Sequence, residues 1–346
     1  MNKNSRWFGI SFRLAAILLA VVFASVILLL SNTNPIDAFR YIIVGSLGSL
    51  SKFTDVLVSW VPLLLVTAGL LLTFTSGLWN IGVEGQITLG AIFTTMVLRF
   101  FMDTTMAPWL IISLSILAGA LGGAIWAMLV GALKIYGGVN EIFGGLGLNF
   151  VATAITIWLI FGPWKRPGTG SMSGTEPFPA QLFLPVFKGY SLSPWALVLA
   201  LFAIVVVYIL LKNTYFGLRL RAVGKNGRAA FLLGVPTNRY MMLSFIMCGF
   251  FAGLAGAVQV TAVYHRLIPS ISSGYGYLGL LVAMLVNYNA IWAALVSFFF
   301  AALNIGSVQL PLMLKVDSTL SGVIQGSLVL FVMLMDGVRR RIMQKR

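Results

Sequence analysis

Long apolar runs of about 20 residues recur along the whole of this chain. They occupy positions 14–30, 56–74, 81–100, 109–133, 141–161, 194–211, 240–263, 275–286, 290–308 and 320–335. A run of this kind crosses the apolar core of a bilayer as a helix, whereas a membrane β-barrel is built from short alternating segments. The runs therefore predict an all-α, polytopic transmembrane bundle of about ten spans.

The charge content supports a membrane protein. Charged residues make up 9% of the 346 residues and hydrophobic residues 59%, while average soluble domains carry about 25% charged residues. The net charge is +15, and the cations lie between the apolar runs and at the termini. This placement indicates that the cations orient the chain in the membrane, and it argues against nucleic-acid binding.

The basic residues also predict which side each loop faces. With a cytoplasmic N-terminus, ten spans return the C-terminus to the cytoplasm, and most of the 23 Lys and Arg residues then lie inside. The run 14–30 resembles a signal peptide, but residues 31–35 lack a small-x-small cleavage pattern, so we interpret it as a retained span. A total of eight or nine spans remains open if the turn before residue 81 or the short run 275–286 re-enters the membrane.

Polar residues cluster at a glycine-rich break between the second and third runs. The cluster comprises Asn80, Gly82, Glu84, Gly85 and Gln86. Glycines disfavour a regular helix, and broken helices in membranes occur where they are buried in protein or line a cavity. We therefore expect a polar lining or hinge of a translocation path. For Glu84 the alternative is a helix cap at the cytoplasmic interface.

The fifth run contains a second polar set. Asn140 precedes the run and is predicted to be a helix N-cap, with Glu141 in the first turn. Asn149 lies deeper, where it either lines the path or forms an interhelical hydrogen bond.

The sequence disfavours catalysis within the membrane. Cys248 and His265 are the single cysteine and the single histidine. This excludes an intrachain disulfide and argues against a metal cluster or a His-based catalytic triad. We expect His265 to lie in a surface loop.

The basic segment 212–239 has the pattern of a short, fixed helix. Asn226 is a predicted N-cap for a helix over about 227–233, Gly234 ends it and Pro236 prevents its continuation. The apolar sequence Phe-Leu-Leu at 231–233 is then exposed and predicts docking to a protein partner. A helix lying on the lipid surface is the alternative.

Several motifs resemble those of one transporter family. The sequence GKNGRAAFLLGV at 224–235 resembles the coupling loop of ABC-importer permeases for branched-chain amino acids, simple sugars and nucleosides, and 244–256 is similar to the span after that loop. NIGVEGQ at 80–86 and SGYGYLGLLVA at 273–283 resemble the nucleoside branch, whose receptors are lipoproteins of the basic-membrane-protein type. The motifs cover most of the chain.

The resemblance implies partners and a division of labour. A second permease (a sister or a copy of this chain), cytoplasmic ATPase subunits and an extracytoplasmic substrate-binding lipoprotein are expected, together with a small solute and membrane lipids. ATP and Mg would be bound by the ATPase, because this chain has no phosphate-binding loop. The resemblance assigns ATPase coupling to Gly224, Asn226, Arg228, Ala229, Ala230 and Gly234.

The expected protein is thus one permease domain, 1–346, in a bacterial-type cytoplasmic membrane, with a weak internal repeat of 56–161 and 240–335. The sugar branch typically has a Gly-Gly-Ile-Asp-Leu sequence at the position of 80–86, so its absence favours nucleosides. A permease for a simple sugar remains an alternative. A secondary transporter is a further alternative, although few ionisable residues lie within the runs.

Overall fold

Helices account for all of the regular secondary structure that is described. The structure, a computed structural model, describes residues 18–168, 174–286 and 289–315, with stretches of one to three residues between 317 and 338. After a helix at Leu18–Leu30, the first half contains α2 (Pro35–Leu47), α3 (Leu50–Thr75), α4 (Val83–Phe101), α5 (Pro108–Ile135) and α6 (Glu141–Phe161). The second half contains η1 (Ala180–Leu182), α7 (Pro194–Asn213), α8 (Tyr215–Lys225), α9 (Gly227–Leu232), α10 (Thr237–Val258), the π-helical turn η2 (Gln259–Tyr264), α11 (Tyr275–Leu285), α12 (Ala290–Ser307) and α13 (Gln309–Leu314). The all-α prediction is confirmed.

Six helical segments are long and apolar enough to cross a membrane: α3, α5, α6, α7, α10 with η2, and Ala290–Leu314. A seventh arises if Leu18–Leu30 and α2, which meet at 111°, form one span. The prediction of about ten also counts α4, α11 and residues 320–335, and the structure describes the last of these only in part. With 11 residues, α11 is about 16 Å long, roughly half the apolar thickness of a bilayer.

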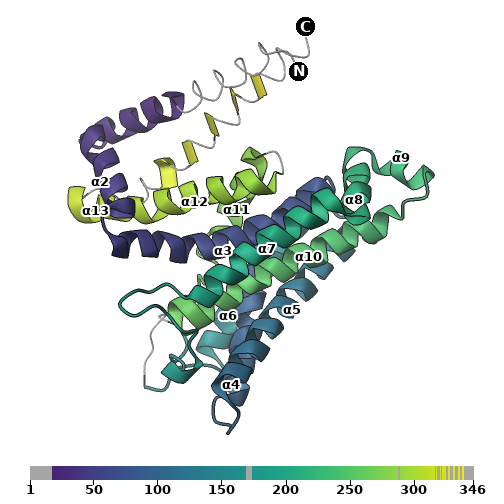
Figure 1. The fold of residues 1–346 in the computed structure, drawn as a ribbon, viewed down its shortest axis with the longest axis horizontal. Helices are drawn as coiled ribbons and strands as arrows, with labels where there is room; N and C mark the ends of the chain where they lie inside the picture. Colours follow the sequence, from purple (N-terminus) through teal and green to yellow (C-terminus); the bar gives the residue numbers. More distant parts are fainter. Residues whose placement is uncertain are drawn as a thin grey trace. The chain divides into compact units, whose positions relative to one another are not determined.

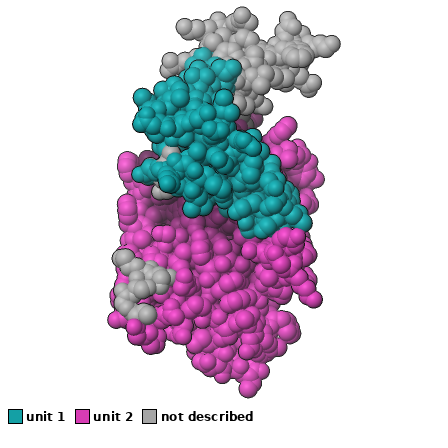
Figure 2. All heavy atoms as spheres, turned by 90° about the vertical axis from the view of Figure 1, so that its left-hand side faces the viewer, with its two compact units in different colours: residues 1–56, 299–346 teal, residues 57–298 magenta. Residues whose placement is uncertain are grey.

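The chain forms two compact units, which are coloured separately in Figure 2. Unit 1 contains residues 1–56 and 299–346. Its described core joins Ala24 and Leu28 of the first helix to Ile42 of α2 and Leu310 of α13. Gly306 allows close packing there, because a Cβ on this residue would overlap the carbonyl oxygen of Ile42.

Unit 2, residues 57–298, contains the break between α3 and α4, a second break between η2 and α11, and the basic segment. Figure 1 shows α5 running alongside α10, with α4 packed against both. Glycines set this close approach: a Cβ on Gly253 would overlap the Gly119 carbonyl oxygen, and one on Gly249 would overlap that of Gly123. Small residues commonly allow membrane helices to approach in this way.

A polar loop folds over one end of unit 2. Its backbone pairs with the segment after α10: Thr175 donates to the Leu267 carbonyl at 2.9 Å and Phe178 to the His265 carbonyl at 2.9 Å. Buried Phe178 joins the core formed by α4, α5 and α6. The loop is therefore a structured cap at the end opposite the basic segment (Figure 1).

Candidate translocation and coupling sites

The first helix break lies where the glycine-rich sequence predicts it. Helix α3 ends at Thr75 and α4 begins at Val83. Gly77 turns the chain with φ +78°, a left-handed conformation that glycine adopts without strain. The adjacent Ser76 hydroxyl lies 3.0 Å from the Ser244 hydroxyl of α10, so the turn is tied to a helix far away in sequence.

Two buried amides close this break. Asn80 donates to Gln86 Oε1 at 3.1 Å, and Gln86 donates back to Asn80 Oδ1 at 2.9 Å. Asn80 Nδ2 also contacts the sulfur of Cys248 on α10 at 3.1 Å. Both amide side chains are fully buried. Their hydrogen-bonding groups are thus used within the protein.

Asn149 of α6 caps the first turn of α4 from outside that helix. Its Oδ1 accepts a hydrogen bond from the Gly85 N–H at 2.8 Å, and its Nδ2 donates to the Ile81 carbonyl at 3.0 Å. The N-cap residue Gly82 offers no side-chain cap, so the N–H of Gly85 would otherwise lack a partner. Of the two roles expected for Asn149, the interhelical hydrogen bond is the one observed.

Glu84 connects the first break to the second. Its Oε1 accepts a hydrogen bond from the Tyr277 N–H, in the first turn of α11, at 3.0 Å. Gly276 lies so close that a Cβ there would come within 2.8 Å of the same oxygen. A carboxylate at a helix N-terminus satisfies free N–H groups and interacts favourably with the helix dipole. Glu84 therefore caps a helix start, as one alternative predicted, but the helix is α11, and its place at the cytoplasmic interface stays a prediction.

The structure brings all six predicted path or hinge residues together around the start of α4. They are Asn80, Gly82, Glu84, Gly85, Gln86 and Asn149. These residues connect α4 to α6, α10 and α11, which is the arrangement of a joint between helices. Their contribution to a solute path stays a prediction. Sequence reasoning missed Ser76, Ser244, Cys248 and Tyr277 as partners, because none of them has a local pattern that predicts the contact.

The basic segment forms the short helix that its sequence predicts. Asn226 Oδ1 accepts from the Ala229 N–H at 3.0 Å, and α9 ends before Gly234, which has φ +82°. Of the other predicted coupling residues, Arg228 and Ala229 are exposed and Ala230 is buried. The apolar tip of α9 is open: Phe231, Leu232 and Leu233 are 65%, 81% and 83% exposed.

Helix α8 connects this exposed tip to the first break. Gly224 packs against the end of α3, where a Cβ would overlap the Thr75 carbonyl oxygen, and it also contacts Gly77. On the other side of α8, Arg219 Nη1 donates to the Tyr240 hydroxyl at 3.1 Å. This hydrogen bond raises the pKa of Arg219, so the guanidinium stays charged. Helix α8 thus connects α9 to the turn at 76–82.

His265 lies in a loop, as expected, but its side chain is half-buried and not at the surface. Its ring stacks on Phe183 with the centroids 3.6 Å apart, and its backbone is left-handed at φ 55°. Burial lowers the pKa of this half-buried imidazole. The loop over 174–193 provides the stacking partner, which local sequence could not reveal.

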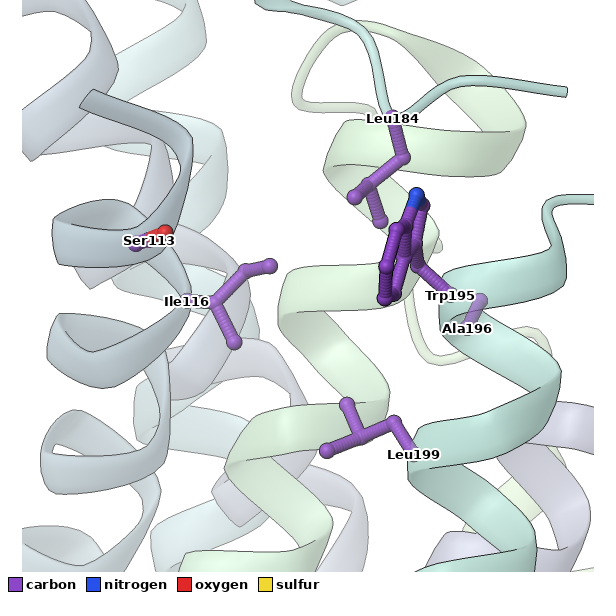
Figure 3. A pocket seen from close by; sticks show the side chains of 6 residues that line it. All are labelled: Ser113, Ile116, Leu184, Trp195, Ala196 and Leu199. Carbon is purple, nitrogen blue, oxygen red and sulfur yellow. The ribbon is translucent and has the colours of Figure 1, made fainter. Parts of the chain in front are cut away.

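A surface pocket between α5 and α7 does not resemble a binding site for a polar solute. Its volume is about 260 Å³. Figure 3 shows its lining, which is apolar apart from the Ser113 hydroxyl and the indole nitrogen of Trp195: Ser113, Ile116, Leu184, Trp195, Ala196 and Leu199. The Ser113 hydroxyl donates to the Trp109 carbonyl at 2.8 Å. A sugar or nucleoside needs several convergent polar groups, which this pocket lacks.

These features define an integral, multi-pass membrane protein with broken helices and a capped helix presented on a basic segment. Residues 53–333 match the family described as the permease component of the branched-chain amino acid transport system. The match covers most of the chain, and the chain belongs to this permease family.

Three curated relatives align over nearly the full length of the chain. The glucose ABC transporter permease protein TsgB13 of Haloferax volcanii is 30% identical over 344 residues, covering 96% of this chain and 90% of the relative. The guanosine ABC transporter permease protein NupP of Bacillus subtilis is 26% identical, with coverage of 92% and 91%. The nucleoside ABC transporter permease protein NupB of Lactococcus lactis is 25% identical, with coverage of 89% and 85%. The family resemblance seen in the sequence motifs is confirmed.

Proposed function

We propose that this chain is the permease subunit of an ATP-driven importer and that its solute is a nucleoside. In this proposal a cytoplasmic ATPase binds ATP and Mg, an extracytoplasmic lipoprotein delivers the solute, and a second permease subunit completes the path. Two of the three relatives described above are named for guanosine or nucleosides. The resemblance of residues 80–86 to the nucleoside branch points the same way.

The observation that carries the coupling role is the exposed tip of α9. Asn226 and Gly234 fix both ends of this helix, and large apolar side chains fully exposed to water are unfavourable unless a partner covers them. Gly224 of α8 contacts the end of α3, so α8 connects α9 to the joint at 76–82. ATPase movement would therefore act on the helices that Asn80, Glu84 and Asn149 hold together.

Leu232→Glu tests the docking role. Leu232 is 81% exposed, so the substitution leaves the core of the permease intact while placing a charge in the proposed interface. Loss of a buried apolar anchor costs about 2 kcal/mol, which is about 30-fold in ATPase affinity. We expect ATPase co-purification and solute-stimulated ATP hydrolysis to fall together. Tyr136→Glu, at a site 78% exposed after α5, is the matched control.

The docking role is wrong if Leu232→Glu retains the ATPase as well as Tyr136→Glu does. A secondary transporter working alone is the better description if the wild-type chain, purified in mild detergent with no ATPase bound, drives uptake after its return to vesicles. These two outcomes are distinguishable, because the first concerns one helix and the second the energy source.

The solute is tested by uptake into vesicles that contain the complete transporter with its receptor. Labelled guanosine, glucose and leucine are compared at equal concentration. We expect ATP-dependent guanosine uptake that unlabelled nucleosides compete for. Uptake of glucose alone would show that the solute is a sugar, the alternative favoured by the similarity to TsgB13. The proposed permease role would remain unchanged.

A further inference from the structure

A basic cavity lies where four segments on the predicted cytoplasmic side meet. Its volume is about 430 Å³. The last turns of α3 and α7 contribute Thr75 and Lys212, α8 contributes Arg221 and Lys225, and Asn289 precedes α12. The topology of ten spans predicted from the sequence places all of these segments at the same membrane surface. The cavity is therefore at the level where two crossing helices end.

The charge of the cavity has one sign. Lys212, Arg221 and Lys225 line it, and none of the other described lining residues carries a carboxylate. Across the described part of the chain, no ion pair joins any of these three side chains to an acid. Arg221 Nε donates to the Gly217 carbonyl at 3.2 Å, which orients the guanidinium, and its two terminal nitrogens have no hydrogen bond within the described residues. Three cations around one space favour an anion with several oxygen acceptors.

Two further lining residues are apolar. Phe74 and Leu211, both buried, contribute to the same cavity. Two residues that come earlier in α7 are also exposed: Ile209 is 45% exposed and Phe202 is 65% exposed. A ligand with a charged head and a hydrocarbon tail therefore has complementary surfaces for both parts, whereas a free anion uses only the first.

We propose that this cavity binds the phosphate group of an anionic phospholipid from the cytoplasmic leaflet. Lys212, Arg221 and Lys225 contact the phosphate oxygens, and an acyl chain lies along the apolar flank of α7. Basic pockets at the cytoplasmic ends of membrane helices are suited to such headgroups. Because Gly224 also lines the cavity and contacts the end of α3, the bound lipid would touch the segment that precedes α9.

The test measures lipid binding to the purified full-length permease by native mass spectrometry. The probes are phosphatidylglycerol, phosphatidylcholine and inorganic phosphate. The test variant is Arg221→Gln with Lys225→Gln. The control is Arg219→Gln with Arg239→Gln, which removes two charges from the same basic segment at residues that do not line the cavity. All four side chains are exposed, so neither variant should disturb folding, which circular dichroism checks.

The expected result is preferential binding of phosphatidylglycerol that the test variant weakens about 25-fold, since each cation near a headgroup contributes about fivefold. The control variant should change it less than about twofold. Equal weakening in both variants would mean general charge attraction and would overturn the proposal. So would equal affinity for phosphatidylcholine, or displacement of the lipid by millimolar inorganic phosphate, which would indicate a free-anion site.

Discussion

Replacing Asn149 with alanine separates a structural role at the joint from a role in binding solute. The asparagine accepts a hydrogen bond from Gly85 and donates one to the carbonyl of Ile81. Alanine favours the helix in which residue 149 lies, so α6 itself should not be weakened. The substitution removes both partners of the segment that begins α4.

The magnitude follows from these two bonds. Asn149 is 8% exposed, so water cannot readily replace it. A buried polar group left without a partner costs about 1–3 kcal/mol, and the two groups together should lower the free energy of unfolding by about 2–6 kcal/mol. Thr153→Ala is the matched control: this exposed residue, one turn later in α6, bonds only within its own helix. Its effect should stay within about 0.5 kcal/mol.

The assay is unfolding of the purified protein by titration with sodium dodecyl sulfate, combined with hydrogen exchange at the N–H of Gly85. We expect Asn149→Ala to unfold at lower denaturant and to lose protection at Gly85. The reasoning is refuted if Asn149→Ala matches Thr153→Ala in both measurements. If it raises the KM of uptake and changes neither measurement, Asn149 contacts the solute instead of holding the joint.

Three further predictions follow from close contacts and from one titratable ring. Gly253→Ala should lower the free energy of unfolding by about 1–3 kcal/mol in the same titration, because its Cβ meets backbone, while Gly147→Ala, with open space around it, should not lower it. Gly224→Ala should impair uptake yet leave ATPase co-purification intact, and loss of binding would contradict transmission through α8. Since burial lowers the pKa of His265, the unfolded state binds the proton more readily, and stability should fall as the pH drops below 6.5 towards the folded-state pKa. His265→Asn, which tolerates the left-handed backbone, should remove this slope in unfolding titrations at several pH values, and a persisting slope would contradict the assignment.

Features set by neighbouring residues were predictable from the sequence. Asn140 caps α6 by accepting from the Ile142 N–H at 2.9 Å, and Asn226 caps α9, both as predicted. The ends of α9 and the break before α4 likewise depend on glycines within a few positions. Local signals worked less well at α3, which begins at Leu50, ahead of the predicted residue 56, because polar residues there did not prevent the helix from forming.

The sequence by itself determined the class of protein, because the length of an apolar run and the position of a cap or glycine are local properties. Only the tertiary structure decided what the buried polar groups do. Asn80 meets Cys248 across 168 positions, Asn149 meets Gly85 across 64, and Glu84 meets Tyr277 across 193. A polar side chain at membrane depth must find a hydrogen-bond partner. The sequence alone does not distinguish which of several distant polar groups is that partner. Helix packing, set by close glycine contacts such as Gly119 with Gly253, selects among them.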